Sequence, residues 1–289
     1  MKIVDQLARP GVSVSFEVFP PKKETDFPRA EQVVREIASL SPSYLSVTFG
    51  AGGGTSPNTV RIAERVQQLG VPALAHLTCV SLTRDQVAAV LDRLKEHGIE
   101  NVLALRGDIP SGGTFPAPRQ YRYASELVRE IKERGDFCIG AACYPEGHVE
   151  CEHKEDDIDH LKAKVDCGCD FLTTQMFFDN NVFYNFLYRI LAKGIRIPVV
   201  AGIMPVTNSR QIRRICALSG TVLPPRFKAI VDRFSDNPPA MKQAGVAYAT
   251  EQIIDLIANG VRAVHVYTMN KPDVARKIIE NLSEIRKIR

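Results

Sequence analysis

The chain has 289 residues, of which 45% are hydrophobic and 24% are charged. This composition is typical of a globular protein and excludes a disordered or collagen-like chain. Its 37 basic and 33 acidic residues are interleaved, so no cationic stripe is available to neutralise a nucleic-acid backbone. No segment has the length and apolar character of a membrane span. We therefore expect a globular protein that binds neither nucleic acid nor a membrane.

The N-terminal segment and the cysteines indicate the compartment. Residues 1–20 carry Asp5, Arg9 and Glu17 among apolar residues, so they lack the uninterrupted apolar stretch of a signal peptide. The seven cysteines are odd in number, and most lie in segments predicted to be buried, which suits reduced thiols. We expect a cytoplasmic protein.

Short apolar segments rich in β-forming residues alternate with longer amphipathic segments along the chain. The predicted strands span residues 12–19, 44–49, 72–79, 101–105, 137–143, 171–176, 197–203 and 263–268. The predicted helices span residues 28–39, 57–69, 83–97, 123–133, 155–166, 181–192 and 209–218, and a last helix runs to Ile288. Residues 224–259 form an insertion with its own helical pattern before the last strand.

Local signals support these helix boundaries. Pro57 suits a first helical turn, Thr83 and Gln86 have the spacing of a capping box, and Gly98 suits a helix end. Eight consecutive βα units with apolar strands predict an α/β fold, a (β/α)8 TIM barrel forming a single domain over residues 1–289. A doubly wound open sheet is the alternative, although no GxGxxG motif follows the first strand.

In such a barrel, catalytic groups lie at the carboxyl ends of the strands. The polar candidates there are Glu17, Thr48, His76, Arg106, Asp108, Tyr144, His148, Gln175 and Tyr267. Any one of them is equally well explained as a hydrogen-bonded barrel residue. Because several converge on one end of the barrel, together they indicate a site.

Two of these candidates have a specific chemical interpretation. Glu17 stands among large apolar residues, so burial should raise its pKa and prepare it to act as a general acid. The alternative is a partner Lys or Arg inside the barrel, which would lower that pKa instead. After the fourth strand, Gly107 lets a ligand approach the backbone, and Asp108 can accept a hydrogen bond from a ring N–H or amino group. An internal ion pair between Arg106 and Asp108 is the alternative there.

Two further patterns are weaker. The glycine-rich loop at residues 50–55 is similar to a phosphate cradle but lacks the Lys of GxxxxGK[ST]. Cys167 and Cys169, with His148, Cys151 and His153 nearby in sequence, do not have the CxxC spacing of zinc sites. We expect no metal.

Eight motifs in order along nearly the whole chain carry a more specific signal. They are Ser-Phe-Glu-Val-Phe-Pro-Pro-Lys (15–22), Ser-Val-Thr-Phe-Gly-Ala (46–51), Ala-His-Leu-Thr-Cys (75–79), Leu-Ala-Leu-Arg-Gly-Asp (103–108), Ala-Cys-Tyr-Pro-Glu-Gly-His (142–148), Thr-Gln-Met-Phe-Phe-Asp (174–179), Gly-Ile-Met-Pro-Val (202–206) and Tyr-Thr-Met-Asn (267–270). Through them the sequence resembles the bacterial methylenetetrahydrofolate reductases, flavoprotein barrels that reduce 5,10-methylenetetrahydrofolate to 5-methyltetrahydrofolate.

The resemblance implies roles for three of the candidates. Glu17 would be the general acid that protonates the folate and opens its five-membered ring to an iminium that accepts hydride from N5 of the reduced flavin. Asp108 would contact the pterin and lie near the flavin, where its charge disfavours anionic reduced flavin. Gln175, with both a donor and an acceptor, would complete recognition of the pterin edge.

The resemblance also implies a flavin site. Its residues are Thr48, His76, Arg106, Gly107, Asp108, Tyr123, Ala124, Tyr144, His148, Asp157, His160 and Lys164. Arg106 and Lys164 would supply positive charge toward phosphate or ring oxygens. We expect FAD, with FMN as the alternative, because His160 and Ala163 replace an Asn and an Arg that contact flavin in well-studied members.

The electron donor is less closely specified. Gln211 matches a residue that contacts NADH and folate, but Ile215 replaces the Phe expected four positions later, so stacking on the adenine would be lost. Lys271 replaces an Arg near the folate tail and keeps its charge without the bidentate fork. We expect NADH or NADPH to charge the flavin and leave before the folate binds to the same face, in a ping-pong cycle.

Two alternatives of other classes remain open, and a homo-oligomer is expected. The chain is either a flavin-bearing subunit that is inert until a redox partner protein docks, or a metal-dependent barrel lyase with His76, His148 and Asp108 as ligands. Ile215 and the cysteine-rich stretch from Cys138 to Cys169 favour the first of these two.

Overall fold

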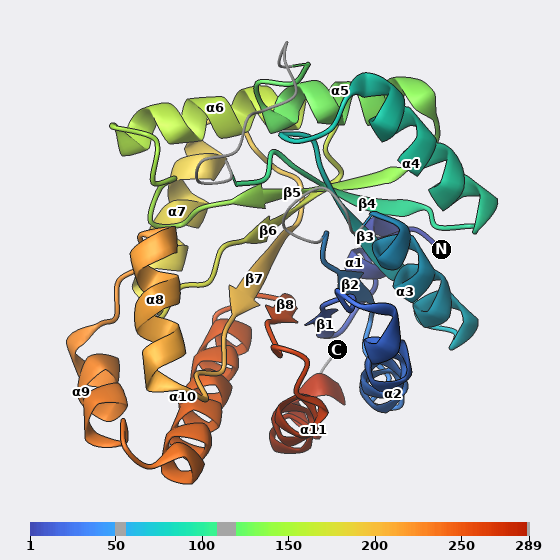
Figure 1. Cartoon of the computed structure of the whole chain (residues 1–289). Coiled ribbons are helices and arrows are strands. Elements are labelled where there is room, and N and C mark those ends of the chain that lie inside the picture. Colours follow the sequence, from blue (N-terminus) through green and yellow to red (C-terminus); the bar gives the residue numbers. More distant parts are fainter. Residues whose placement is uncertain (50–55, 109–119, 288–289) are drawn as a thin grey trace.

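The computed structural model describes residues 1–49, 56–108 and 120–287. Eight parallel strands form a closed barrel in chain order (Figure 1). They are β1 (Ser13–Val18), β2 (Leu45–Val47), β3 (Ala73–Thr78), β4 (Asn101–Leu105), β5 (Cys138–Cys143), β6 (Phe171–Thr174), β7 (Val199–Ile203) and β8 (Ala263–Val266). The predicted TIM barrel is confirmed, and the doubly wound sheet is excluded because β8 pairs with β1.

Helices cover the outside of this barrel. They are α2 (Phe27–Ala38), α3 (Ser56–Gln68), α4 (Arg84–Glu96), α5 (Ala124–Arg134), α6 (Lys154–Asp166), α7 (Asn180–Ala192), α8 (Ser209–Ser219), α9 (Pro225–Arg233), α10 (Pro238–Ala258) and α11 (Pro272–Asn281), with short 3-10 helices at Glu24–Asp26 and Ile285–Lys287. From α2 to α8, each helix begins and ends within one residue of its predicted bounds.

The predicted capping box at the start of α4 is also confirmed. The Thr83 side chain accepts a hydrogen bond from the Gln86 backbone, and the Gln86 side chain accepts one from the Thr83 backbone. Two unpaired N–H groups at the helix start are thereby satisfied.

The last helix is shorter than predicted. The final helix was expected to run to Ile288, but α11 ends at Asn281, where Leu282 turns into the core and is fully buried. The chain then continues into the second 3-10 helix, and the Arg286 guanidinium donates to the carbonyl of Ser41, 3.1 Å away. Tertiary packing therefore ends the helix before its amphipathic pattern does.

A short N-terminal helix, α1 (Ile3–Leu7), was not predicted, because five residues are too few to show a period. It covers the amino-terminal end of the barrel, where Ile3 N donates to Asn101 Oδ1 at 2.8 Å. Ile3 and Leu7 pack against one buried cluster of strand residues, formed by Tyr44, Leu74, Leu103, Cys138, Phe171, Val200 and Ala263. This apolar layer closes one end of the barrel interior and leaves the carboxyl ends of the strands for a site.

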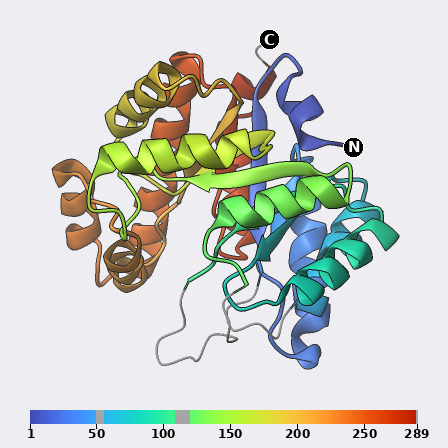
Figure 2. The same ribbon diagram turned by 90° about the horizontal axis from the view of Figure 1, so that it is seen from above.

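The helical insertion before β8 is also confirmed, and it consists of α9 and α10. Figures 1 and 2 both place α8 and α9 on the opposite side of the barrel from α3 and α4. Helix α10 packs against α7, α9 and α11. It approaches the loop after β7 at Gly245, where an added Cβ would lie 1.7 Å from the carbonyl oxygen of Val206. The insertion is therefore fitted against the barrel rather than appended to it.

This contact gives the first prediction. In a helix interior, Gly to Ala is normally stabilising by about 1 kcal/mol, but Gly245→Ala should lower the free energy of unfolding by about 1–3 kcal/mol, because the new methyl group overlaps the Val206 backbone. The measurement is urea unfolding followed by circular dichroism. Ala247→Ser adds one atom on the exposed side of the same helix and should change stability by less than about 0.5 kcal/mol. A Gly245→Ala protein more stable than its parent would contradict the close approach.

Candidate functional site

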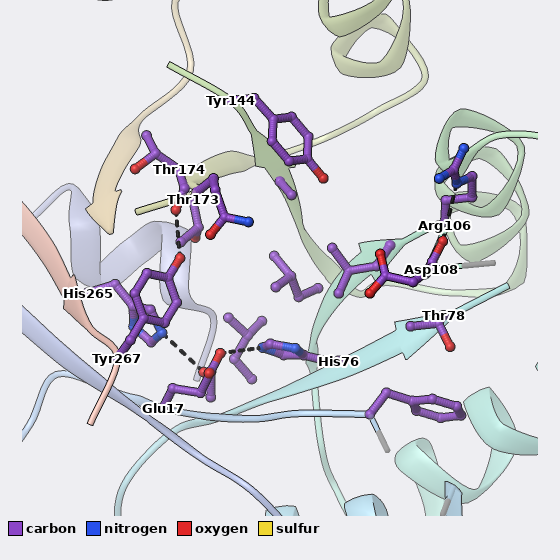
Figure 3. Close-up of a pocket in the computed structure, with 18 of the residues that line it drawn as sticks. Glu17, His76, Thr78, Arg106, Asp108, Tyr144, Thr173, Thr174, His265 and Tyr267 are labelled. Carbon is purple, nitrogen blue, oxygen red and sulfur yellow. Dashed lines mark hydrogen bonds and ion pairs between the residues drawn. The ribbon is translucent and has the colours of Figure 1, made fainter. Parts of the chain in front are cut away.

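A cavity of about 610 Å³ opens at the carboxyl ends of the strands (Figure 3). Every strand except β7 supplies residues to the lining of this cavity, either from the strand itself or from the loop that follows the strand. The polar side chains of the lining are Glu17, Ser46, His76, Thr78, Ser81, Arg106, Asp108, Tyr144, His148, Thr173, Thr174, Gln175, His265 and Tyr267. All the strand-end candidates predicted from the sequence, except Thr48, therefore converge on one cavity.

Glu17, on β1, lines this cavity and is only 8% exposed. Thr268 Oγ1 donates a hydrogen bond to the backbone carbonyl oxygen of Glu17 at 2.8 Å and fixes the end of the strand. Loss of hydration raises the pKa of Glu17 to about 8, because the charged carboxylate is penalised in this environment. The expected direction is confirmed, and the carboxyl is protonated at neutral pH.

The alternative for Glu17, a partner Lys or Arg, is not observed. Across residues 1–49, 56–108 and 120–287, no Lys or Arg forms an ion pair with this carboxyl. Its nearest basic group is His76 on β3, with 3.8 Å between His76 Nε2 and Glu17 Oε2. Burial lowers the pKa of His76 to about 3, so this imidazole is neutral.

A second buried histidine, His265 on β8, was missed by the sequence analysis. It lies one layer below the strand ends, where a candidate search restricted to strand ends does not reach. Its Nδ1 is 2.8 Å from Ser15 Oγ and its Nε2 is 3.2 Å from Ser46 Oγ. Burial lowers the pKa of His265 to about 3. The alternation of His265 and Tyr267 along an otherwise apolar strand is the signal that would have found it.

Tyr267 and Gln175 occupy the β6–β8 side of the cavity. The Tyr267 hydroxyl donates to the carbonyl of Thr174 at 2.6 Å, and burial raises its pKa. Gln175 directly follows β6; its backbone N–H donates to Cys143 O at 2.7 Å, and its Oε1 accepts from Met176 N at 3.0 Å. Both side chains are thus held by backbone contacts beside the cavity.

The rim on the other side carries Arg106, Gly107 and Asp108. An Arg106–Asp108 ion pair is not observed, because the guanidinium binds both carboxylate oxygens of Glu150, at 2.5 and 2.6 Å. Gly107 has a φ of +86°, and a Cβ there would lie 3.0 Å from that of Thr78, so glycine is needed at this position. Asp108 is exposed at the mouth of the cavity.

The wall after β5 is aromatic. The rings of Tyr144 and His148 meet edge to face, with 4.7 Å between their centroids. Asp157 Oδ2 accepts a hydrogen bond from His148 N at 3.3 Å. Lys164 Nζ donates to the carbonyl of Ala142 at 2.6 Å, and burial lowers its pKa. Asp157 and Lys164 therefore support this wall from α6 without lining the cavity.

The remaining predicted site residues lie apart from the lining. Tyr123 is 55% exposed, Ala124 begins α5, and His160 is exposed on α6. Thr48 directly follows β2, and its carbonyl accepts from Thr59 Oγ1 at 3.0 Å. The structure does not gather these four with the cavity residues.

Gln211 lines a separate, small hollow beside the end of β7, with Thr207, Ile215 and Met269 among its neighbours. The Lys271 ammonium donates to Thr207 Oγ1 at the edge of this hollow. Gln211 and Lys271, both predicted from the resemblance to be substrate-site residues, thus lie outside the lining of the main cavity.

The predicted phosphate cradle at residues 50–55 lies outside the described residues. Within the described ranges, no group of three or more His, Cys, Asp or Glu side chains is placed to hold a metal ion. His76, His148 and Asp108, the ligands of the metal-dependent alternative, do not form such a group. None of the helices in the described ranges has the length and apolar character needed to span a membrane.

The raised pKa of Glu17 predicts a pH-dependent stability. Because its folded pKa is about 8 and its ordinary value is 4.5, the folded chain holds a proton that the unfolded chain releases between these values. Stability is therefore lost as the pH rises through this window. Glu17→Gln removes the effect. As the pH rises, the free energy of unfolding of this variant should therefore increase relative to that of the parent by a few kcal/mol, at about 1.4 kcal/mol per unit of pKa shift.

Urea unfolding of both proteins between pH 5 and pH 8.5 measures this difference. Glu96→Gln, on the exposed side of α4, should follow the pH dependence of the parent. Parallel curves for Glu17→Gln and the parent would show that Glu17 is ionised in the folded protein.

Comparisons of the chain with known proteins all point to one family. The family model described as methylenetetrahydrofolate reductase matches residues 2–283. The chain is 34% identical to the 5,10-methylenetetrahydrofolate reductase of Pectobacterium carotovorum subsp. carotovorum, over 94% of this chain and 90% of that protein. It is 33% identical to the protein of the same name in Escherichia coli, with the same two coverages.

Two other comparisons concern length and fold. The chain is 34% identical to methylenetetrahydrofolate reductase (NADH) 1 of Arabidopsis thaliana over 99% of its own residues, but it spans only 51% of that protein. Among solved structures, a protein from Clostridium thermocellum described as binding two copies of 5-methyl-5,6,7,8-tetrahydrofolic acid superposes with a TM-score of 0.66. The two chains share 14% identity over 96% of each, so this likeness concerns the fold.

Proposed function

Because the chain belongs to the methylenetetrahydrofolate reductase family, we propose that it reduces 5,10-methylenetetrahydrofolate to 5-methyltetrahydrofolate with a bound flavin and NADH or NADPH. One observation carries the proposal: Glu17 is a buried, protonated carboxyl in the lining of a large cavity. Reduction of this substrate needs an acid to open its five-membered ring, and a carboxyl with a pKa near neutrality is suited to that task.

The surroundings of Glu17 favour proton donation. A carboxyl of ordinary pKa would be ionised at neutral pH, whereas the Glu17 side chain, with a pKa of about 8, keeps its proton until a substrate nitrogen accepts it. His76 and His265 are neutral, so neither holds the proton in competition with Glu17. In this account, Glu17 gives its proton to the folate and recovers one from water once the product has left.

The residues present fit a flavin. The cavity volume of about 610 Å³ is within the range of cofactor sites. Thr173 Oγ1 is a buried polar atom without a hydrogen-bond partner within the described ranges, as expected where a ligand supplies one. When bound, the flavin supplies the hydride. We propose FAD, with Arg106 toward its phosphates or ring oxygens and Tyr144 and His148 as its wall, which Lys164 supports from behind through the Ala142 carbonyl.

Folate recognition falls to the side chains facing Glu17 across the cavity. Asp108 can accept hydrogen bonds from the amino group and ring N–H of a pterin, and Gln175 can both donate and accept. Lys271 and Gln211 lie at the small hollow beyond β7, and the family resemblance assigns both to the substrate site. We assign the pterin to the main cavity and the folate tail to this hollow.

The reductant would enter by the same mouth, because the main cavity opens at the carboxyl end of the barrel and α1 covers the other end. Reductant and folate would then bind in turn, as a ping-pong cycle requires. A flavin-bearing subunit that depends on a redox partner is the second candidate. It is favoured by Ile215, which lines the hollow beside Gln211 in place of an aromatic residue.

Two wider expectations accompany this function. The cysteines at positions 79, 138, 143, 151, 167, 169 and 216 are all free thiols in the structure, which supports a reducing, cytoplasmic location. We also infer a homo-oligomer from the family resemblance.

The purified protein should therefore be yellow, bleach on addition of NADH or NADPH, and recolour with 5,10-methylenetetrahydrofolate. Glu17→Gln should bleach at nearly the parental rate, because hydride transfer to the flavin does not need this acid. Its recolouring by folate should slow by about 10²–10⁴-fold, the contribution of a general acid. Stopped-flow absorbance at the flavin band measures both half-reactions separately.

Glu133→Gln, on the exposed side of α5, is the matched control and should change neither half-reaction. A colourless protein that binds no flavin would overturn the proposal. Bleaching that requires a second protein would favour the subunit over the self-sufficient enzyme. Equal loss of both half-reactions in Glu17→Gln would make Glu17 a structural residue.

A further inference from the structure

The two buried histidines near Glu17 differ in how their ring nitrogens are occupied. Both nitrogens of His265 have serine partners, Ser15 Oγ at 2.8 Å and Ser46 Oγ at 3.2 Å. In contrast, His76 Nε2 is buried and has no hydrogen-bond partner within the described ranges. A buried nitrogen left without a partner costs stability unless a ligand or a functional state supplies one.

The atom nearest to this nitrogen among the acidic groups is Glu17 Oε2, at 3.8 Å. Figure 3 shows the imidazole of His76 pointing at the carboxyl of Glu17. The distance is too long for a hydrogen bond. However, the backbone of Glu17 is fixed by Thr268, while its side chain has three torsions, so a small rotation of the carboxyl closes the gap.

We propose that His76 is a positioning residue for Glu17, whose Nε2–H donates a hydrogen bond to the carboxylate left when Glu17 gives up its proton. This inference rests on the proposed function, in which Glu17 is the acid. It explains why the nitrogen has no partner while the carboxyl is protonated: its partner forms during the reaction. Because the imidazole has a second ring nitrogen, Nδ1, His76 can contact the flavin through Nδ1 while Nε2 serves Glu17.

Several of the other titratable or charged side chains around Glu17 are already committed to other partners. The titratable and charged groups nearby are His76 from β3 and His265 and Tyr267 from β8, with Arg106, Asp108 and Tyr144 farther along the rim (Figure 3). The Tyr267 hydroxyl donates its proton to Thr174 O at 2.6 Å, and the guanidinium of Arg106 is engaged by Glu150. Asp108 in its charged form has no donor.

A neutral donor suits an acid that must both keep and release a proton. A cation at this place would hold Glu17 permanently ionised, and an apolar residue would leave the carboxylate with nothing to stabilise it. Burial keeps His76 neutral, so it contributes a hydrogen bond without a full charge. The pKa of Glu17 is therefore raised by burial, and His76 limits the rise.

The test measures the pKa of Glu17 in the full-length protein by infrared spectroscopy, with the carboxyl band assigned by its loss in Glu17→Gln. His76→Leu removes the donor and should raise the pKa of Glu17 by about one pH unit, because hydrogen bonds to charged groups are worth at least that much. His76→Gln keeps an N–H donor and should restore the parental value to within about 0.3 units.

Tyr267→Phe is the matched control. It removes a polar group from the lining of the same cavity, but one committed to Thr174, and should shift the pKa of Glu17 by less than about 0.3 units. An unchanged pKa in His76→Leu would overturn the proposal. A lowered pKa would overturn it too, because the imidazole would then accept a proton from Glu17 rather than donate to it.

Nitrogen NMR of the parent protein tests the same point without a substitution at position 76. His76 should be protonated on Nε2, and its Nε2 resonance should shift at the pH where Glu17 titrates but not in Glu17→Gln. A His76 protonated only on Nδ1 would contradict the proposal. Both measurements are made without folate or reductant, so they succeed or fail independently of the enzymatic activity assigned above.

Discussion

The site depends on a carboxyl group that has been removed from water without receiving a cation. Glu17 is 8% exposed, faces neutral imidazoles and hydroxyls, and has a pKa of about 8. Desolvation of this kind costs stability, so a barrel that served only as a scaffold would replace Glu17 by an apolar residue. Its presence here, without a Lys or Arg partner in the described ranges, is the strongest physical argument for acid chemistry at this end of the barrel.

The rest of the barrel interior maintains this condition in layers. The lowest layer, closed by α1, is apolar and keeps water out from below. The middle layer is polar but uncharged: His265 bridges Ser15 and Ser46, and each ring nitrogen has a partner. Among the described residues that line the cavity, Arg106 and Asp108 stand at the rim, where Arg106 pairs with Glu150. Charge thus increases toward the mouth, where anionic parts of a cofactor and substrate would bind.

Much of this arrangement could be predicted from the sequence. The strand and helix periods, the capping box at Thr83 and the predicted insertion before β8 led to the barrel, and the barrel rule then led to Glu17, His76, Arg106 and Tyr144 at one end. Features that depend on packing were not accessible. Helix α1 is too short to show a period, α11 ends where Leu282 turns inward, and Arg106 pairs with Glu150, a residue 44 positions away. His265 was missed because it lies one layer below the strand ends.

A crystal structure of the protein with flavin and 5-methyltetrahydrofolate bound would show whether Glu17 can reach the folate. We expect both ligands in the cavity at the carboxyl ends of the strands, with the Glu17 carboxyl within about 2.6–3.2 Å of a folate nitrogen or joined to it through one water molecule. A folate bound elsewhere, or a flavin lying between the folate and Glu17 so that no proton could pass, would contradict this expectation.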